Sequence, residues 1–467
     1  MPKKSSYYPY ANRFPVNDRM PDQGRPRDEI LEELRTLASE EDAFWQTGKC
    51  SGTMYCGDMD HYAFLKEAYG LYAHVNALQR DMCPSATRFE GEIIAMTLDM
   101  LHADSARPDS NPAGAVTSGG TESILTALLV YREEARQERG ITGPQVILPE
   151  TAHPAFRKGA HLFGLEIVDA PIDPETTLVD VDFVRDAINE RTAVIVGSAC
   201  NYGYGTIDPI EQLSEIALEK GVGLHVDGCL GGFILSWGQE LGYDIPVFDF
   251  RLPGVTSISA DTHKYGYAPK GTSVFACRER TLRDYASFTQ AHWSGGKYLS
   301  PGMAGSRSGG LLAATWASMV SMGREGYLKY AKLIFETAFA MQKSVRSHPE
   351  LRIFGEPTFC FGFTSDQFDI YHLNDFMRQR GWRFNGLQHP NGIHMCVTRP
   401  QTQPGVADAF ATDLADAVAY ARGPHEAAPK TGAVYGSMPK NIPQVDDAIR
   451  SAMLEMIDAQ QSVPHLD

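Results

Sequence analysis

Residues Val255 to Gly266 read VTSISADTHKYG, an apolar run followed by a polar turn that contains Lys264. Further upstream, another apolar run ends in an acid, Asp227. A deprotonated lysine forms Schiff bases with carbonyl compounds, and an acid facing the pyridine nitrogen is the usual partner of pyridoxal 5'-phosphate. If Lys264 and Asp227 lie on opposite sides of one crevice, the pair indicates a site for this cofactor.

Around this stretch, short β-branched runs alternate with longer amphipathic ones. The runs with strand character are 114–117, 145–148, 166–170, 193–197, 223–226, 256–259 and 273–276. Stretches with helical periodicity, such as 123–136, 181–189 and 210–220, lie between most of them. The alternation predicts an α/β fold with a mostly parallel seven-stranded sheet that is covered by helices.

The pattern changes after residue 322, where helical stretches (327–345, 371–379 and 406–421) alternate with few strand-like pieces, such as 394–398. A last helix is predicted from about 444 to 460. These features predict a smaller α+β domain at the C-terminus. We divide the chain into an N-terminal arm and helix (1–57), a large cofactor-binding domain (58–322) and a small C-terminal domain (323–467).

Polar residues follow several predicted strands, at the edge where open α/β sheets bind ligands. Gly119-Gly120-Thr121 opens a helix and can offer backbone N–H groups to an anion, although a simple capped turn explains it equally well. His153 follows the second strand, where an imidazole can stack on a pyridine ring or serve a structural role. Asn201 follows the fourth strand and is a candidate contact to cofactor or substrate.

Composition and charge exclude several classes of protein. The 467 residues carry a net charge of −16, which argues against a nucleic-acid binder. The sequence contains no run of about 18 apolar residues, so no transmembrane segment is predicted. No apolar stretch follows the basic N-terminus, so no signal peptide is predicted either. Cys50, Cys56 and His61 lack a second CxxC half, so no metal site is predicted. The scattered cysteines suit reduced thiols and a cytoplasmic protein; release as an effector without a signal peptide stays open.

Residues Gly295 to Ser308 form a small, polar stretch with two basic side chains, Lys297 and Arg307, and a tyrosine, Tyr298. It is predicted to be a loop. One interpretation is a plain surface loop. The other is a loop lent to the phosphate region of a neighbouring subunit.

Taken together, these motifs resemble a known family. The segments TSGGTES (117–123), HVDGCLGGF (225–233) and SADTHKYGYAPKG (259–271) are similar to the group II pyridoxal-phosphate-dependent decarboxylases of fold type I. SGTMY (51–55), AGSR (304–307) and Tyr435-Gly436 extend the likeness over nearly the whole chain. Within the group, the sphingosine-1-phosphate lyases match best, because HKYGYAPKG is typical of that branch.

The resemblance implies a role for each matching residue. Lys264 would be the Schiff-base lysine, Asp227 the partner of the pyridine nitrogen and His153 the residue stacked on the ring. The cofactor phosphate would be held by Gly120, Thr121 and His263, with Gly305 and Ser306 from a second subunit of a homodimer that shares its active sites. The substrate would be bound by Tyr55, Asn76, Gln79, Lys270, Tyr298 and Arg307. Gln79 stands where the family pattern has a histidine, so phosphate binding or proton transfer is expected to differ there.

The implied reaction is cleavage of the C2–C3 bond of a small amphiphilic substrate, a phosphorylated sphingoid base, to a long-chain aldehyde and phosphoethanolamine. Lys264 and Tyr298 are both candidate proton carriers. Two alternatives stay open. An amino-acid decarboxylase on the same scaffold would need an arginine for the α-carboxylate, and a non-catalytic scaffold protein would be expected to have lost part of the set formed by Lys264, Asp227 and His153.

Overall fold

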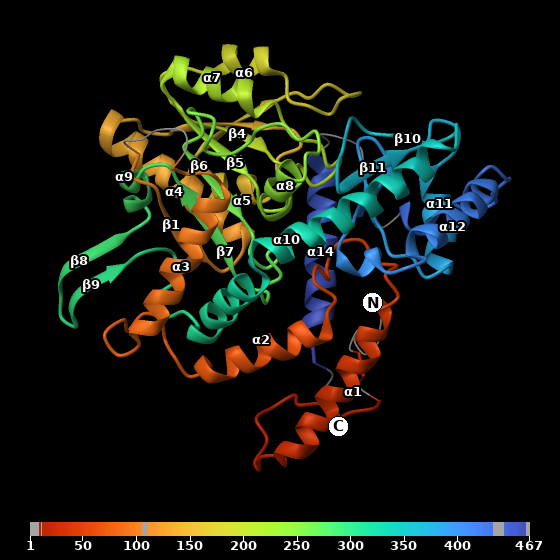
Figure 1. The fold of residues 1–467 in the computed structure, drawn as a ribbon, viewed down its shortest axis with the longest axis horizontal. Helices are drawn as coiled ribbons and strands as arrows, with labels where there is room; N and C mark the ends of the chain where they lie inside the picture. Colours follow the sequence, from red (N-terminus) through yellow and green to blue (C-terminus); the bar gives the residue numbers. More distant parts are fainter. Residues whose placement is uncertain (1–8, 11, 105–109, 433–442, 464–467) are drawn as a thin grey trace.

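The computed structural model describes residues 9–10, 12–104, 110–432 and 443–463. Its centre is a seven-stranded sheet with the order β1-β7-β6-β5-β4-β2-β3 (Figure 1). The strands are β1 (Ala113–Thr117), β2 (Gln145–Pro149), β3 (Glu166–Ala170), β4 (Thr192–Ser198), β5 (Gly223–Asp227), β6 (Ser257–Ala260) and β7 (Ser273–Cys277). All seven predicted strands are present with boundaries within one residue, and the predicted α/β fold class is confirmed.

One strand runs against the rest of the sheet. β7 pairs antiparallel with both β1 and β6, whereas the other neighbours pair in parallel. The residues between β6 and β7 contain no helix, and a parallel return needs a crossover that usually contains one. The Lys264 turn is therefore a short loop held between two adjacent strands.

Both faces of the sheet are buried. Along β2, Val146 and Leu148 pack in one hydrophobic cluster with helices α4 and α5, whereas Ile147 packs in the other with helices α7, α8 and α10. Successive side chains of a strand point to opposite faces, so a strand covered on both sides is apolar throughout. This explains why central strands such as β4 are continuous apolar runs in the sequence, for example Ala193 to Val196.

The helices surround this sheet (Figure 1). From the N-terminus to the residues just after β7 they are α1 (Arg27–Trp45), α2 (Met59–Tyr72), α3 (Pro84–Met100), α4 (Gly120–Arg139), α5 (Ala155–Phe163), α6 (Val181–Ala187), α7 (Ile210–Lys220), α8 (Gly232–Glu240) and α9 (Arg280–Asp284). After it come α10 (Gly309–Arg346), α11 (Ile370–Gln379), the 3-10 helix η2 (Arg399–Thr402), α12 (Val406–Ala421) and α14 (Pro443–Gln461).

Helix α10 spans the predicted domain boundary at 322/323. The helix is interrupted at Gly323, whose φ of 54° and ψ of 175° are not helical. The break coincides with the point where the sequence pattern changes. The division into residues 1–57, 58–322 and 323–467 stays a prediction.

The C-terminal part contains a four-stranded antiparallel sheet with the order β10-β11-β13-β12. Its strands are β10 (Arg352–Ile353), β11 (Cys360–Thr364), β12 (Asn385–Leu387) and β13 (Gly392–Cys396). The predicted strand 394–398 begins two residues too late, and β10, β11 and β12 were missed. β10 and β12 are too short to show a two-residue alternation, which is the signal of a half-buried strand.

The stretch predicted as a loop at 295–308 is partly a strand. β8 (Phe288–Trp293) and β9 (Gly296–Ser300) form a hairpin that extends away from the body (Figure 1). Every residue of β8 is exposed. The glycine pair Gly295-Gly296 lies where the two strands join, and the prediction did not include this hairpin.

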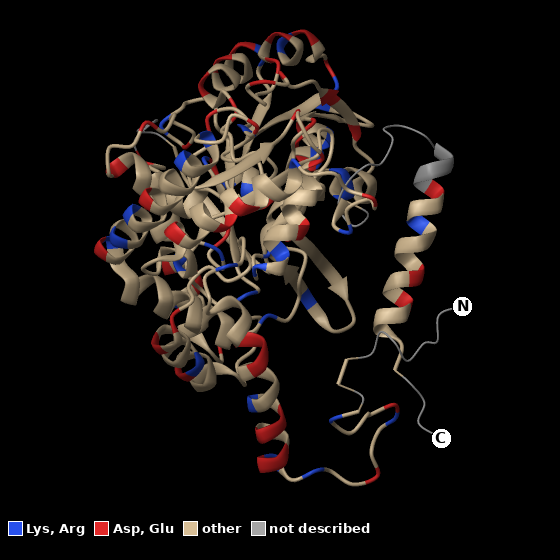
Figure 2. Cartoon of the chain, turned by 90° about the vertical axis from the view of Figure 1, so that its right-hand side faces the viewer, with Lys and Arg blue, Asp and Glu red and all other residues tan. Residues whose placement is uncertain are grey.

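Helix α14 stands apart from the body of the chain (Figure 2). In this view acidic and basic residues are both spread along the chain, and the net charge of the full sequence is −16. No helix of the described residues combines the length and apolarity needed to cross a membrane. The start of the predicted arm (1–8) and the Tyr435-Gly436 likeness lie outside the described residues.

All eight cysteines are free thiols, and all except the half-buried Cys83 are buried. Cys50 and Cys56 belong to no metal-binding arrangement: within the described ranges there is no group of three or more His, Cys, Asp or Glu side chains suited to a metal ion. The His61 ring instead lies 3.0 Å from the carbonyl oxygen of Tyr267.

Candidate active site

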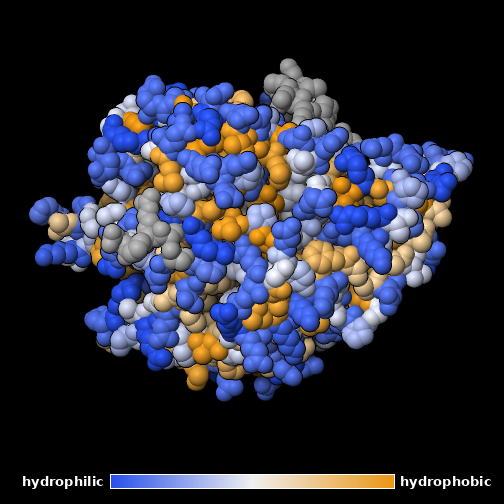
Figure 3. Space-filling view, turned by 45° about the horizontal axis from the view of Figure 1, so that its top comes forward, coloured by the Kyte–Doolittle hydropathy of each residue, from blue (hydrophilic) through white to orange (hydrophobic). Residues whose placement is uncertain are grey.

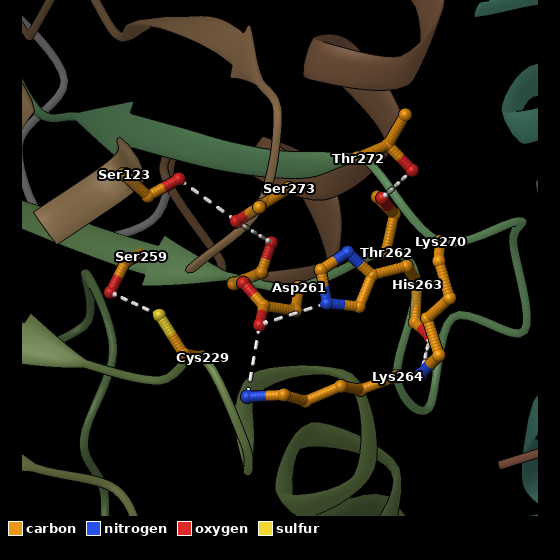
Figure 4. Close-up of polar contacts among 12 residues, drawn as sticks. Ser123, Cys229, Ser259, Asp261, Thr262, His263, Lys264, Lys270, Thr272 and Ser273 are labelled. Atoms are coloured by element: carbon orange, nitrogen blue, oxygen red, sulfur yellow. Dashed lines mark hydrogen bonds and ion pairs between the residues drawn. The ribbon is translucent and has the colours of Figure 1, made fainter. Parts of the chain in front are cut away.

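Lys264 projects from the loop between β6 and β7 toward a buried acid that the sequence analysis did not single out. Its Nζ lies 2.9 Å from Oδ2 of Asp261 (Figure 4). The Asp261 side chain is 1% exposed, and a buried carboxylate is stable only when it is paired or hydrogen-bonded. Asp261 follows a buried strand, as Asp227 does, and this was the signal that could have identified it.

The same pairing sets the charge of Lys264. Burial disfavours the charged amine and is the largest single effect, but the charge and hydrogen bond of Asp261 together with Tyr55 and Cys229 outweigh it, and the pKa of Lys264 is raised above its ordinary value. In the absence of a cofactor the amine therefore carries its proton. Reaction with a carbonyl group requires that proton to leave, and the Asp261 carboxylate is an acceptor within hydrogen-bond distance.

The glycine turn packs directly against this pair. A Cβ at Gly120 would lie 2.7 Å from Asp261 Oδ2 and 2.9 Å from the Sγ of Cys229, and Gly119 has a φ of +148°. Only glycine therefore suits these positions. The turn opens helix α4, whose N-terminus presents backbone N–H groups and the positive end of the helix dipole to an anion.

His263 completes the anion side of the site. Its Nε2 lies 3.5 Å from Asp261 Oδ2, and a Cβ at Gly119 would lie 3.1 Å from its Cε1. Its Nδ1 is buried and has no hydrogen-bond partner among the described residues. Burial lowers the pKa of His263, so the neutral ring can donate one hydrogen bond to a phosphate oxygen.

Asp227 ends β5, opposite Ser259 of β6 in the sheet register. Its Oδ1 accepts hydrogen bonds from the backbone N–H of Cys229 at 3.0 Å and from the Ser259 hydroxyl at 3.3 Å. The side chain is 7% exposed. Asp227 and Asp261 thus lie at the ends of two adjacent strands, β5 and β6.

Lys270 and Tyr55 form a second cationic position next to the lysine loop. The Lys270 Nζ lies 4.4 Å from the centroid of the Tyr55 ring and 3.2 Å from the carbonyl oxygen of His263, to which it donates. Tyr55 packs edge-on against Tyr265, with ring centroids 5.1 Å apart. Tyr55 and Lys270, both predicted to bind substrate, are therefore in contact.

Three further residues were predicted to bind the cofactor: Asn201, His153 and Thr121. Asn201 is buried; its amide donates to Thr206, with Nδ2 2.6 Å from Oγ1, and its carbonyl accepts from the Tyr204 backbone N–H at 2.9 Å. Its hydrogen bonds thus close the 201–206 turn. His153 is exposed, and its Nδ1 accepts from the backbone N–H of Ala155 at 3.2 Å. Thr121 is exposed in the first turn of α4.

The remaining predicted residues form a separate cluster in this chain. Asn76 donates to the Ser306 hydroxyl at 3.0 Å, and the Arg307 guanidinium forms an ion pair with the buried Glu90. Tyr298 lies on the exposed hairpin, with its hydroxyl near Gly305. Gln79, the departure from the family pattern, is exposed. Asn76 thus contacts Ser306, and Arg307 contacts helix α3 through Glu90.

The groups around Lys264 suit pyridoxal phosphate. The backbone N–H groups at the start of α4 and the Nδ1 of His263 can donate to the phosphate, Lys264 can provide the amine, and Asp227 can provide the acid for the ring nitrogen. The Cys229 thiol donates to the Ser259 hydroxyl at 3.2 Å (Figure 4), and that hydroxyl donates to Asp227. The assignment of individual residues to the cofactor stays a prediction.

Comparison with known proteins gives consistent matches. The model of the pyridoxal-dependent decarboxylase conserved domain matches residues 9–361. The sphingosine-1-phosphate lyase of Dictyostelium discoideum is 41% identical over 90% of this chain and 78% of its own length. The structure of a sphingosine-1-phosphate lyase from Burkholderia pseudomallei is 59% identical, with a TM-score of 0.92, over 98% of this chain and 100% of that one.

A more distant match shows the fold alone. Glutamate decarboxylase of Lactobacillus brevis is 20% identical, with a TM-score of 0.75, over 89% of this chain and 98% of its own. The scaffold is therefore shared between lyases and decarboxylases, and the residues near Lys264 must distinguish them.

Proposed function

The chain belongs to the sphingosine-1-phosphate lyase family of pyridoxal-dependent decarboxylases, and we propose on that basis that it cleaves the C2–C3 bond of phosphorylated sphingoid bases. The products are a long-chain aldehyde and phosphoethanolamine. The observation that carries this proposal is the contact of Lys270 and Tyr55 beside the Lys264 loop. It supplies a cation for a substrate phosphate within a site built for the cofactor.

Pyridoxal phosphate is the cofactor; when bound, it accepts the electron pair released as the carbon–carbon bond breaks. Asp227 keeps a proton on the ring nitrogen, and the neutral His263 and the α4 turn hold the phosphate. His153 covers the ring. Lys264 and Tyr298 are the two groups able to return a proton to C2 of the substrate. Lys270 attracts the substrate phosphate as a point charge.

The decisive measurement is the identity of the products. Purified enzyme with added cofactor is incubated with sphingosine 1-phosphate, and long-chain aldehyde and phosphoethanolamine are quantified by mass spectrometry. We expect both in equal amounts. Parallel incubations with glutamate and tryptophan are expected to release no carbon dioxide. Carbon dioxide without aldehyde would identify an amino-acid decarboxylase, and a cofactor-binding protein with neither product would be a scaffold.

The charge of Lys270 predicts the pH dependence of substrate capture. Burial and the nearby Lys264 lower the pKa of Lys270 to about 8. Its ammonium is lost as pH rises through this value, so kcat/KM should fall above about pH 8, while kcat at saturating substrate changes less. Lys270→Arg keeps its charge, and its profile should stay flat over this range. An unchanged fall in this variant would assign the titration to another group.

We further propose a homodimer that shares its active sites. Tyr298 lies on the exposed hairpin of β8 and β9, which extends away from the body of the chain (Figure 1), and Gly305 and Ser306 follow it; this position suits residues lent to a partner subunit. The exposed apolar side chains of the hairpin support this: Phe288 is 59% and Trp293 is 55% exposed. Such a contact would bury them.

Mixing two inactive variants tests the sharing. Lys264→Arg and Tyr298→Phe are each expected to be inactive as purified proteins. If subunits exchange at random, half of the dimers are mixed and each has one site with both residues intact, so roughly a quarter of wild-type activity returns. If Tyr298 serves its own chain, no mixed dimer contains an intact site, and the mixture stays inactive.

The free thiols bear on the cellular compartment of the protein. Eight unpaired cysteines suit a reducing compartment, and we place the protein in the cytoplasm. Cell fractionation followed by immunoblotting tests this directly.

A further inference from the structure

Four polar side chains lie together on one face of the central sheet, inside the molecule. His225 of β5 lies opposite Ser257 of β6, and Asp227 lies opposite Ser259 in the same register. Alternate residues of a strand point to the same face, so the four side chains share one side of the sheet. Polar residues are common on the outside of this molecule, as the largely hydrophilic face in Figure 3 shows. Inside a sheet that is buried on both faces, each of them needs a hydrogen-bond partner.

His225 bridges the two serines. Its Nδ1 lies 2.8 Å from the Oγ of Ser257, and its Nε2 lies 3.4 Å from the Oγ of Ser259. Burial lowers the pKa of His225 to about 4, so the ring is neutral near pH 7, and a neutral imidazole has one donor and one acceptor nitrogen. The ring also packs against Phe156 and Phe275, with centroids 5.8 Å and 6.3 Å away, which restricts its orientation.

The hydrogen bonds of Ser259 decide which nitrogen of His225 carries the hydrogen. The Ser259 hydroxyl donates to Oδ1 of Asp227 at 3.3 Å. A hydroxyl has a single hydrogen to donate, so in the contact with His225 it must accept, and Nε2 is the donor. Nδ1 then accepts from the hydroxyl of Ser257, whose oxygen lies 2.6 Å from the Tyr131 hydroxyl. The donors thus form a row that ends at Asp227.

This row of donors acts on the carboxylate that is predicted to face the ring nitrogen of the cofactor. The backbone N–H of Cys229 and the Ser259 hydroxyl both donate to Oδ1 of Asp227, and within the described part of the chain no group donates to Oδ2. Hydrogen bonds to a carboxylate favour its ionised form. An ionised carboxylate leaves the proton on the nitrogen that it faces, whereas a neutral carboxyl group would hold the proton on oxygen.

We propose that His225 is a positioning residue, which holds the Ser259 hydroxyl in the orientation that keeps Asp227 ionised and leaves Oδ2 for the ring nitrogen of the cofactor. His225 acts through Ser259 and not by contact with the cofactor. The inference rests on the proposed role of Asp227 toward pyridoxal phosphate and deepens it, because it names the residues that set the state of this acid.

Nitrogen NMR of the holoenzyme, loaded with pyridoxal phosphate that is isotopically labelled at the ring nitrogen, tests the proposal. The chemical shift distinguishes a protonated from an unprotonated pyridine nitrogen, and we expect the protonated position in the wild type near pH 7. Ser259→Ala removes the donor, and His225→Phe keeps an aromatic ring but removes Nε2. Both variants should shift the resonance toward the unprotonated position, and a wild-type shift in either would overturn the proposal.

Ser236→Ala is the matched control. Ser236 is also buried, but its hydroxyl donates to the carbonyl oxygen of Gly232 within helix α8, at 3.0 Å. This variant should keep the wild-type shift, and a change as large as that of Ser259→Ala would refute a specific role of the row of donors. An unprotonated nitrogen in the wild type would refute the role of Asp227 and the inference with it. The product analysis described above tests the lyase reaction independently of both.

The position of the hydrogen on His225 can also be measured directly, without the His225→Phe variant. Nitrogen NMR of holoenzyme with isotopically labelled histidine rings distinguishes the two neutral forms of the ring. The signals of His225 are those displaced by both Ser257→Ala and Ser259→Ala. We expect the hydrogen on Nε2. A hydrogen on Nδ1 would overturn the proposal, because Nε2 could not then donate to Ser259.

Discussion

Replacement of Lys264 by arginine is expected to abolish the near-visible absorbance of the bound cofactor and to lower kcat by at least about a thousandfold, the scale of a lost acid–base and covalent group. Arginine keeps the positive charge beside Asp261 but cannot form the covalent bond to a carbonyl. The effect therefore isolates the chemistry of the amine from its electrostatic role. Absorbance spectroscopy of the purified variant, before and after addition of cofactor, measures it.

The alanine variant tests the structural role of the same residue. Lys264→Ala leaves the buried Asp261 carboxylate without its cation, and breaking a buried pair costs about 3–5 kcal/mol. Thermal unfolding should therefore show Lys264→Ala to be clearly less stable than Lys264→Arg, although neither binds cofactor covalently. A variant that retained the absorbance band would exclude Lys264 as the attachment point.

Gly120→Ala is expected to lower the affinity for the cofactor by roughly 10- to 100-fold, corresponding to about 1–3 kcal/mol of overpacking. The added methyl group would lie within 3 Å of both carboxylate oxygens of Asp261 and of the Cys229 sulfur. Asp261 must then move, and Lys264 and His263, which both contact it, move with it. Titration of the apoenzyme with pyridoxal phosphate, followed by its absorbance, gives the dissociation constant.

Gly91→Ala is the matched control for this substitution. Gly91 lies in helix α3, and a Cβ there would meet no atom within 4 Å. Alanine in an exposed helix position is favoured over glycine by about 1 kcal/mol, so this variant should be slightly more stable and bind cofactor normally. If both variants bound the cofactor equally well, the phosphate would not depend on the α4 turn.

The central sheet could be predicted from sequence because burial on both faces leaves a direct signature. Runs such as Ala193 to Val196 are apolar throughout, and each is bounded by polar or glycine-rich turns. The positions of Lys264 and Asp227 at strand ends followed from the same pattern. The antiparallel direction of β7 has a local cause, because no helix separates this strand from β6. A hydrophobic pattern does not encode this direction, since it follows from hydrogen bonding between strands.

The partners of each residue could not be predicted in this way. Asp261 was part of the decisive stretch, yet its pairing with Lys264 depends on the loop folding back over three residues. Asn201 was placed at a strand end as a cofactor contact, and the structure shows its amide occupied by Thr206 and Tyr204. Polar residues at strand ends serve both ligands and turns, and only the three-dimensional contacts separate the two.

The eight free cysteines can report on unfolding, because their burial decides when each thiol reacts with a reagent. Because Cys83, before helix α3, is the one thiol that is partly exposed, a maleimide reagent should modify the native chain at a single position. Cys229, against the glycine turn, would react only when the region around Lys264 opens, and the other six only as the sheets and helices separate. The mass of the labelled chain would then give the number of modified cysteines, and this number would report how much of the structure has unfolded.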